Sequence, residues 1–172
     1  ASHHQATTEA LPDAVARDLV QRAIQCLDVS DTLLAARASI AAVREAAHTR
    51  GLLRSATDKQ CAAEARRYGY TDQSSLVREV TLLRTACFIV IGFFSGIRDS
   101  EILSLEAGCL VRDTDAYGEP MLWLHGTLYK TAESRKGRAV RWLVPPVIER
   151  AVKQLERLTG PLCERLRAKQ TE

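Results

Sequence analysis

Apolar and polar residues follow helical spacing over most of the first hundred positions. In the segment 11–27 the apolar residues recur with a period of 3.6, which is typical of a helix with one buried face. Capping residues and glycines mark where the following helices begin and end. Segment 86–94 is apolar all round, which predicts that both faces of its helix are covered. The predicted helices span 11–27, 32–49, 57–68, 75–95 with Ser75 as N-cap, and 100–107.

The spacing changes after Gly108, where short runs with strand character replace the helical pattern. Segment 115–120, between the first two runs, is rich in turn-forming residues. In the third run Val140, Trp142 and Val144 alternate with residues on the opposite face, as expected for a strand packed on one side. The predicted strands span 110–114, 121–129 and 139–144.

After the Pro-Pro pair at 145–146 an amphipathic helix is predicted over 147–158, and a short separate helix is predicted after Pro161. Together the elements predict a mainly α-helical domain with a small three-stranded antiparallel β-sheet, an α+β fold. Residues 1–10 are polar and are interpreted as a disordered or tag-like tail. The remaining residues, 11–172, are expected to form one domain.

The composition favours a globular protein without a disulfide framework, a metal site or a membrane span. The chain has 172 residues, 46% of them apolar, as a globular domain requires. Its five cysteines are scattered without a C-x-x-C pair, which argues against a disulfide framework and a metal site and favours a reducing compartment. The longest apolar run is shorter than the roughly 20 residues that a membrane span needs. We therefore expect a cytoplasmic protein with no membrane partner.

Charge is distributed unevenly along the chain. The formal net charge is +3, but residues 1–129 hold 13 Lys and Arg against 16 Asp and Glu, whereas residues 130–172 hold 11 against 5. A basic C-terminal third favours a polyanionic partner near that end. Charge runs are more often a solvated face, so this pattern supports a partner only together with other evidence.

Arg98 is the first candidate for binding chemistry. It follows Gly96 at the end of the apolar helix and precedes the next predicted helix. Its planar guanidinium fits two oxygens of a phosphate or carboxylate, and a helix N-terminus adds affinity for an anion. Glu101, three residues later, faces the same side and is placed to hold the guanidinium. The alternative is a purely structural Arg98–Glu101 salt bridge.

Two lysines of the second predicted hairpin are candidate proton donors. Lys130 follows the end of the second predicted strand, and Lys136 lies in the basic loop after it. A compact ammonium group on a flexible stem suits donation of a proton to a leaving alkoxide. The sequence does not choose between the two lysines, and a charged hairpin tip that only maintains solubility is the alternative.

The order of these features resembles the catalytic domain of the tyrosine recombinases, the phage integrase family. The family box Gly-x-Arg-x-Ser-Glu-Ile-Leu-x-Leu appears here as residues 96–105, followed by a hairpin lysine, here Lys130, and a strand ending in a Val-Pro step at 144–145. The resemblance covers about 11–159 and is most specific over 82–158. It implies a DNA breaking-rejoining fold and a parent protein from a mobile element.

The resemblance also implies roles for residues. Arg98 would clamp the scissile phosphate, supported by Glu101, and Lys130 would protonate the departing 5′-oxygen. The implied partners are double-stranded DNA and further protomers on that DNA, with nucleoid association. No cofactor, metal or small-molecule substrate is implied, because a phosphotyrosine link conserves the phosphodiester energy. The remaining cations of the implied DNA-facing surface are Arg135, Lys136, Arg138 and Arg141.

The family pattern is incomplete in this chain. The family also uses a His-x-x-Arg box and a tyrosine nucleophile C-terminal to these parts, but no histidine follows His125 and no tyrosine follows Tyr129. We therefore interpret residues 11–172 as the N-terminal half of a catalytic domain, inactive alone, with 28–74 as a helical insertion. Loss of the second half is expected to expose apolar surface along 82–94 and to promote self-association.

Two other classes of function stay open. One is a non-catalytic DNA-binding or regulatory protein that keeps a recombinase-like fold. The other is a helical interaction module with no nucleic-acid role, in which Arg98 and Glu101 form only a structural pair.

Overall fold

A computed structural model describes residues 11–128 and 137–170 of the chain, and every structural statement below refers to those residues. The fold is mainly helical with one small antiparallel sheet of three strands, which confirms the predicted α+β class. The elements are α1 (Asp13–Asp28), α2 (Ser30–Thr49), α3 (Arg54–Arg67), α4 (Gln73–Ser95), α5 (Asp99–Ile102), β1 (Leu110–Thr114), β2 (Pro120–Leu128), β3 (Arg138–Leu143) and α6 (Pro146–Gln170).

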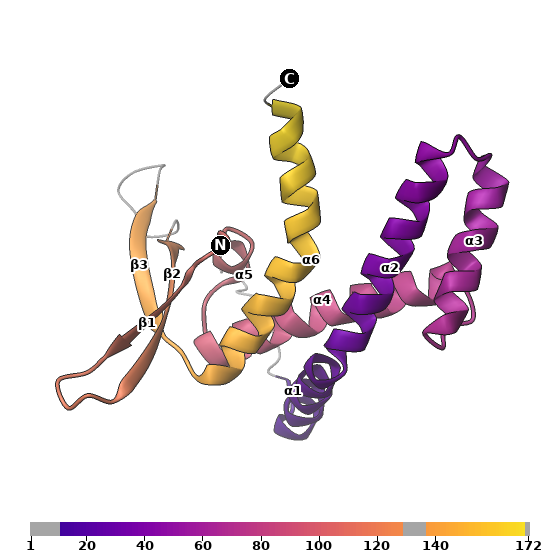
Figure 1. The fold of residues 1–172 in the computed structure, drawn as a ribbon. Helices are drawn as coiled ribbons and strands as arrows, with labels where there is room; N and C mark the ends of the chain where they lie inside the picture. The colour runs from indigo at the N-terminus through magenta and orange to yellow at the C-terminus, as the bar shows by residue number, and fades with distance from the viewer. Residues whose placement is uncertain (1–10, 129–136, 171–172) are drawn as a thin grey trace, which may run out of the picture.

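The elements are arranged along α4. Figure 1 shows the sheet at one end of the molecule and the α2–α3 pair at the other, with α4 running between them. In the described residues α4 contacts each of the other helices. Its buried face includes Leu83, Cys87, Val90 and Ile91, which are almost completely removed from solvent. This face is the centre of the hydrophobic core.

The sheet has the strand order β1-β2-β3, and both pairings are antiparallel. Leu124 in the central strand lies opposite Leu110 on one side and Trp142 on the other, and it is fully buried. Val140 and Trp142 are partly buried and Val144 is buried, whereas Arg141 is exposed. The alternation predicted for the third strand is therefore confirmed.

Helix α4 begins earlier than predicted. Its N-cap is Asp72, whose carboxylate accepts the backbone N–H of Ser75 at 2.7 Å, while the Ser75 Oγ accepts the backbone N–H of Asp72 at 3.3 Å. Ser75 is thus the third residue of the helix and forms a capping box with Asp72, rather than being the N-cap itself. The prediction was wrong because the sequence offers several residues that can cap a helix, and only the backbone conformation selects one of them.

The prediction that segment 86–94 is covered on all sides is also wrong. Phe93 is 58% exposed, and its ring contacts Phe94 edge-on with 5.3 Å between the centroids. Leu82, one residue before the buried Leu83, is 53% exposed. Apolar surface therefore exists on this helix, but it is limited to isolated side chains beside a buried face.

The two helices after α4 differ from their predicted lengths. Helix α5 ends at Ile102 because the amides that follow that of Leu103, those of Ser104 and Leu105, bond three residues back, and the Ser104 hydroxyl donates to the Glu101 carbonyl. Helix α6 continues through Pro161, where a new helix was predicted. Its axis changes direction along its length in Figure 1, as expected where proline removes one backbone bond.

Segment 28–74 contains α2 and α3, which pack against each other and against α4. Buried residues from these helices, among them Ile40, Cys61 and Ala65, belong to the same core cluster as α4. Whether this segment is an insertion relative to a protein family stays a prediction. Among the described helices, none combines the length and hydrophobicity that a membrane span requires.

We predict that Gly126→Ala destabilises the protein by about 1–3 kcal/mol through overpacking. A Cβ atom at Gly126 would lie 3.0 Å from Cζ3 of Trp142 and 3.2 Å from Cδ2 of Leu105. In a strand, alanine is normally more stabilising than glycine, so a decrease in the free energy of unfolding would be due to the clash. Urea unfolding measures the change in the free energy of unfolding. Trp142→Phe removes the outer indole ring, so the double variant should lose less stability than the two single variants lose together. Strictly additive costs would contradict this packing.

Candidate nucleic-acid interface

The joint between α4 and α5 is fixed by its backbone and by two buried anchors. Gly96 ends α4 with φ +66, and its amide donates to the Gly92 carbonyl at 3.0 Å. Ile97 and Ile102, on either side of the next turn, are both buried. A Cβ added at Gly92 would lie 3.3 Å from Cδ1 of Ile102, so the first turn of α5 packs closely on α4. The residues between these anchors therefore have little freedom to move.

Arg98 lies inside this joint, directly before α5, and its backbone is extended, with φ −76 and ψ 155. The Glu101 carboxylate accepts the backbone N–H of Arg98 at 2.9 Å with one oxygen and its Nη1 at 3.2 Å with the other. The Glu101 side chain is only 3% exposed, whereas that of Arg98 is 48% exposed. The pairing that their spacing predicts is present, and it leaves part of the guanidinium open to solvent.

This arrangement suits recognition of an anion. The nearly buried Glu101 carboxylate holds the guanidinium through Nη1, so less side-chain entropy is lost when its other N–H groups bind an anion. Among the described residues no hydrogen bond uses Nη2 or Nε of Arg98, so these groups retain donors for oxygen atoms of a phosphate or carboxylate. The same pair also forms a structural salt bridge within the joint.

The predicted hairpin cations are only partly described. Strands β2 and β3 pair antiparallel, with Arg138 opposite Leu128, and Arg138 is exposed. The three other hairpin candidates, Lys130, Arg135 and Lys136, lie outside the described residues. The choice between the two lysines therefore stays a prediction.

Arg141 lies on the outer face of the sheet, where no described helix packs. Its guanidinium carbon is 4.3 Å from the centroid of the Trp123 ring, a cation–π contact. Its neighbour Trp142 points to the opposite face, toward Leu105 and Gly126. In the described contacts Arg141 is not brought together with Arg98. Sequence reasoning missed Trp123, although alternation along β2 places it on the same face as Arg141 once the strands are paired.

Several cations of the C-terminal third form ion pairs within the molecule. Arg150 pairs with Asp28 and Arg157 pairs with Asp31, which ties α6 to the α1–α2 corner. Arg37 adds a hydrogen bond of 2.8 Å from its Nη1 to the Leu158 carbonyl. The basic segment therefore offers less free charge than its composition suggests. Within the described residues the cations of this segment without an ion pair are Arg138, Arg141, Arg165, Arg167 and Lys169.

Glu149 on α6 joins the sheet to the helix. Its carboxylate accepts from Arg112 of β1 at 2.6 Å and from Lys153 at 2.8 Å. These hydrogen bonds, that from Arg112 first, hold the pKa of the Glu149 carboxyl below its ordinary value of 4.5. Because the folded pKa is lower than the unfolded one, the ionised carboxylate stabilises the fold above pH 4.5.

We predict that this contribution is lost as the pH falls through the folded pKa of Glu149, below 4.5. Glu149→Gln should lower stability at neutral pH by less than about 1 kcal/mol, since Arg112 is largely exposed. It should also flatten the fall in stability below pH 4.5. Chemical denaturation over pH 3–7 measures both effects. Glu164→Gln, an exposed α6 carboxylate without an ion pair among the described residues, is the control. Identical pH profiles for wild type and Glu149→Gln would contradict the prediction.

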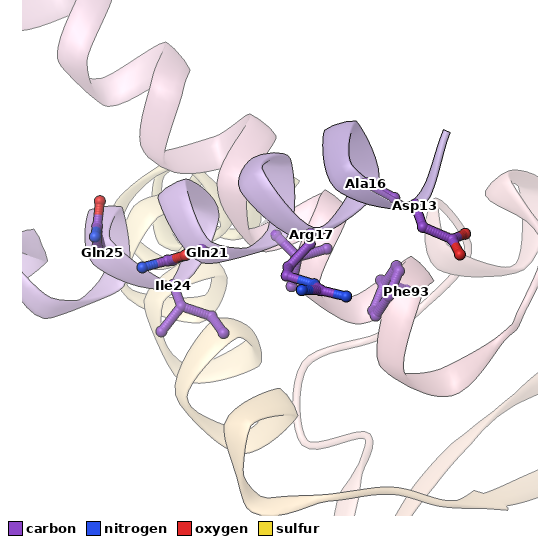
Figure 2. A pocket seen from close by; sticks show the side chains of 8 residues that line it. Asp13, Ala16, Arg17, Gln21, Ile24, Gln25 and Phe93 are labelled. Atoms are coloured by element: carbon purple, nitrogen blue, oxygen red, sulfur yellow. The ribbon is translucent and has the colours of Figure 1, made fainter. Parts of the chain in front are cut away.

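A pocket of about 590 Å³ lies between α1 and the end of α4 that leads to Arg98. Figure 2 shows Arg17 and Asp13 on either side of Phe93 in this pocket, with Gln21 and Ile24 further along α1. The pocket brings a second exposed cation, Arg17, to this end of α4. The sequence carries no signal for it, because α1 and α4 meet only in the folded chain.

The cysteines show no sign of catalysis or metal binding. Cys61, Cys87 and Cys109 are buried, and all five cysteines are free. Burial raises the pKa of the Cys87 thiol to about 12 and raises that of Cys109, so both are protonated at neutral pH. Within residues 11–128 and 137–170, no group of His, Cys, Asp and Glu is arranged to hold a metal ion.

Comparisons with known proteins add no identification to this geometry. No protein-family model matches the chain, and no curated protein matches it.

Proposed function

We propose that this chain binds the backbone of duplex DNA through Arg98 and is part of a tyrosine site-specific recombinase. The observation that carries the proposal is a guanidinium held by a nearly buried carboxylate at the α4–α5 joint while 48% of its side chain is exposed. An arginine fixed on one edge and free on the other is preorganised to grip a phosphate. The sequence box at residues 96–105 supports the same assignment.

The proposed chemistry follows from the charges. Arg98 would stabilise the additional negative charge that develops on the scissile phosphate in the transition state. Lys130 would donate a proton to the departing 5′-oxygen. No tyrosine follows Tyr129 and no histidine follows His125, so we propose that these 172 residues bind DNA without cleaving it.

The proposed DNA-facing surface centres on Arg98 and extends to the β2–β3 hairpin. Exposed Arg138 begins β3, and the hairpin residues Lys130, Arg135 and Lys136 would continue the surface. Arg141 would contribute less, because it stacks on Trp123 on the outer face of the sheet. Arg17, beside Phe93, adds a cation that the sequence did not indicate.

Substitution of Arg98 also affects its partner, the nearly buried Glu101 carboxylate. Arg98→Ala would leave a carboxylate that is 3% exposed with only a backbone N–H, and an under-satisfied buried charge destabilises the fold. A loss of DNA affinity would then be mixed with a loss of stability. Arg98→Gln removes the charge but keeps an amide that can donate to Glu101, and is therefore the sharper variant.

We predict that fluorescence anisotropy with labelled duplex DNA detects binding that weakens steeply between about 50 and 200 mM salt. Arg98→Gln should weaken this binding for every DNA sequence and reduce the slope of log K against log salt by about one. Arg22→Gln is the matched control. Arg22 is 73% exposed on α1 and its ion pair among the described residues is with Asp18 of its own helix, so its loss should leave the slope unchanged.

Two results would refute the proposal. One is binding that does not depend on salt, and the other is an equal effect of Arg98→Gln and Arg22→Gln. Thermal melting of each variant in the absence of DNA separates misfolding from loss of a phosphate contact. A non-catalytic DNA-binding protein with a recombinase-like fold would give the same binding data, because this test concerns the contact and not the cleavage.

A protein-interaction module without a nucleic-acid role is the second candidate function. It is favoured by the pairing of Arg150 and Arg157 with acidic residues of α1 and α2, which neutralises two half-exposed arginines. In that case Arg98→Gln would leave DNA affinity unchanged and affect only stability.

A further inference from the structure

The C-terminal part of α6 carries an apolar face with nothing packed on it among the described residues. All side chains from Pro161 to Gln170 are exposed, and Figure 1 shows this part of the helix projecting away from the body of the molecule. Leu162, Cys163 and Leu166 lie at helical spacing on one side, and both leucines are 54% exposed. We call these three residues the α6 stripe.

The α6 stripe continues directly into a groove with a volume of about 950 Å³. The groove lies between α4, the turn after α5, and α6. Its apolar walls include Phe88 and Leu105, and Leu103 at its edge is 78% exposed. Leu155 and Thr159 line it from α6, about two turns and one turn before the stripe, respectively. Groove and stripe thus form one long apolar surface.

Charges of both signs border this surface. Glu106 and Glu156 lie on its rim, as do Arg84 and Arg167. Glu156 and Arg167 belong to the same helix and flank the same edge of the stripe. A rim with both signs fits a protein surface with matching opposite charges better than it fits a small anion or cation.

We propose that the α6 stripe docks into the groove of a second copy of this chain, in an antiparallel pair with two-fold symmetry. With the axis between Gly160 and Pro161, Leu155 of each copy faces Leu166 of the other, and Thr159 faces Leu162. The same symmetry brings Glu156 of each copy to Arg167 of the other, offset by about 3 Å along the axis at 1.5 Å per residue. Each contact occurs twice, as an isologous interface requires.

The shape of α6 explains why a second copy occupies the groove rather than the chain's own stripe. Helix α6 forms one wall of the groove, and the stripe lies further along the same helix, where its change of direction carries it away from the body of the molecule. Of the stripe residues, Cys163 lines the groove of its own chain, whereas Leu162 and Leu166 are not among the residues that line it. A second copy running in the opposite direction brings its stripe to the groove and leaves its own groove open for the reciprocal contact.

Light scattering coupled to size-exclusion chromatography, in the absence of DNA, tests the proposal. We expect the mass of a dimer at micromolar concentrations. The double variant Leu162→Glu and Leu166→Glu should give a monomer that keeps its fold, because both residues lie outside the core. The matched control is Arg165→Gln with Lys169→Gln, which changes the net charge equally on the other edge of the same helix and should leave the dimer intact.

A charge swap tests the antiparallel register. Glu156→Arg or Arg167→Glu should each raise the dissociation constant of the dimer roughly tenfold, because both reciprocal pairs are lost at once. The two substitutions together should restore much of the affinity. Any loss from the hydrogen bond that Glu156 accepts from the Gly108 amide is common to Glu156→Arg and the double swap.

Three results would overturn the proposal. The first is a monomer at the highest concentration measured. The second is a dimer that survives Leu162→Glu with Leu166→Glu, which would assign association to another surface, such as Phe93. The third is a double swap that is no tighter than the single variants.

Discussion

Burial of one face of α4 is the constraint on which the rest of the structure depends. Each of the other helices contacts α4, and Leu83, Val90 and Ile91 on that face are almost fully removed from solvent. Because the core forms along a single helix, the sheet and the α2–α3 pair lie at opposite ends of the molecule (Figure 1). The C-terminal end of α4 therefore decides where Arg98 is presented.

The candidate site combines a well-packed joint with an arginine that is paired with Glu101 and still about half exposed. Gly96 turns the chain, Ile97 and Ile102 anchor it, and Glu101 holds the guanidinium of Arg98 from within. A buried carboxylate is costly unless it is paired, so the pair stabilises the joint and orients the arginine at the same time. One interaction thus serves the structural role and is the basis for the proposed phosphate contact.

The composition of the chain did not indicate which cations are paired or where apolar residues are exposed. Arginines of α6 pair with Asp28 and Asp31, far away in sequence, and so hold α6 against the first two helices. Exposed cations without an ion pair among the described residues remain on most helices, and near the candidate site they include Arg138 and Arg141 of β3. Apolar surface is exposed in the groove and along the α6 stripe, whereas in segment 82–94 the exposed residues include Leu82 and Phe93.

The sequence by itself determined the type and order of the main elements, because the periods of 3.6 and 2 are local properties of the chain. The spacing of Arg98 and Glu101, three positions apart where a helix begins, also predicted that they pair, as they do in the fold. Only the tertiary structure decided that Asp72 caps α4, that α6 passes through Pro161, and that Arg141 stacks on Trp123. Those outcomes depend on backbone conformation and on contacts between residues distant in sequence, which no local pattern encodes.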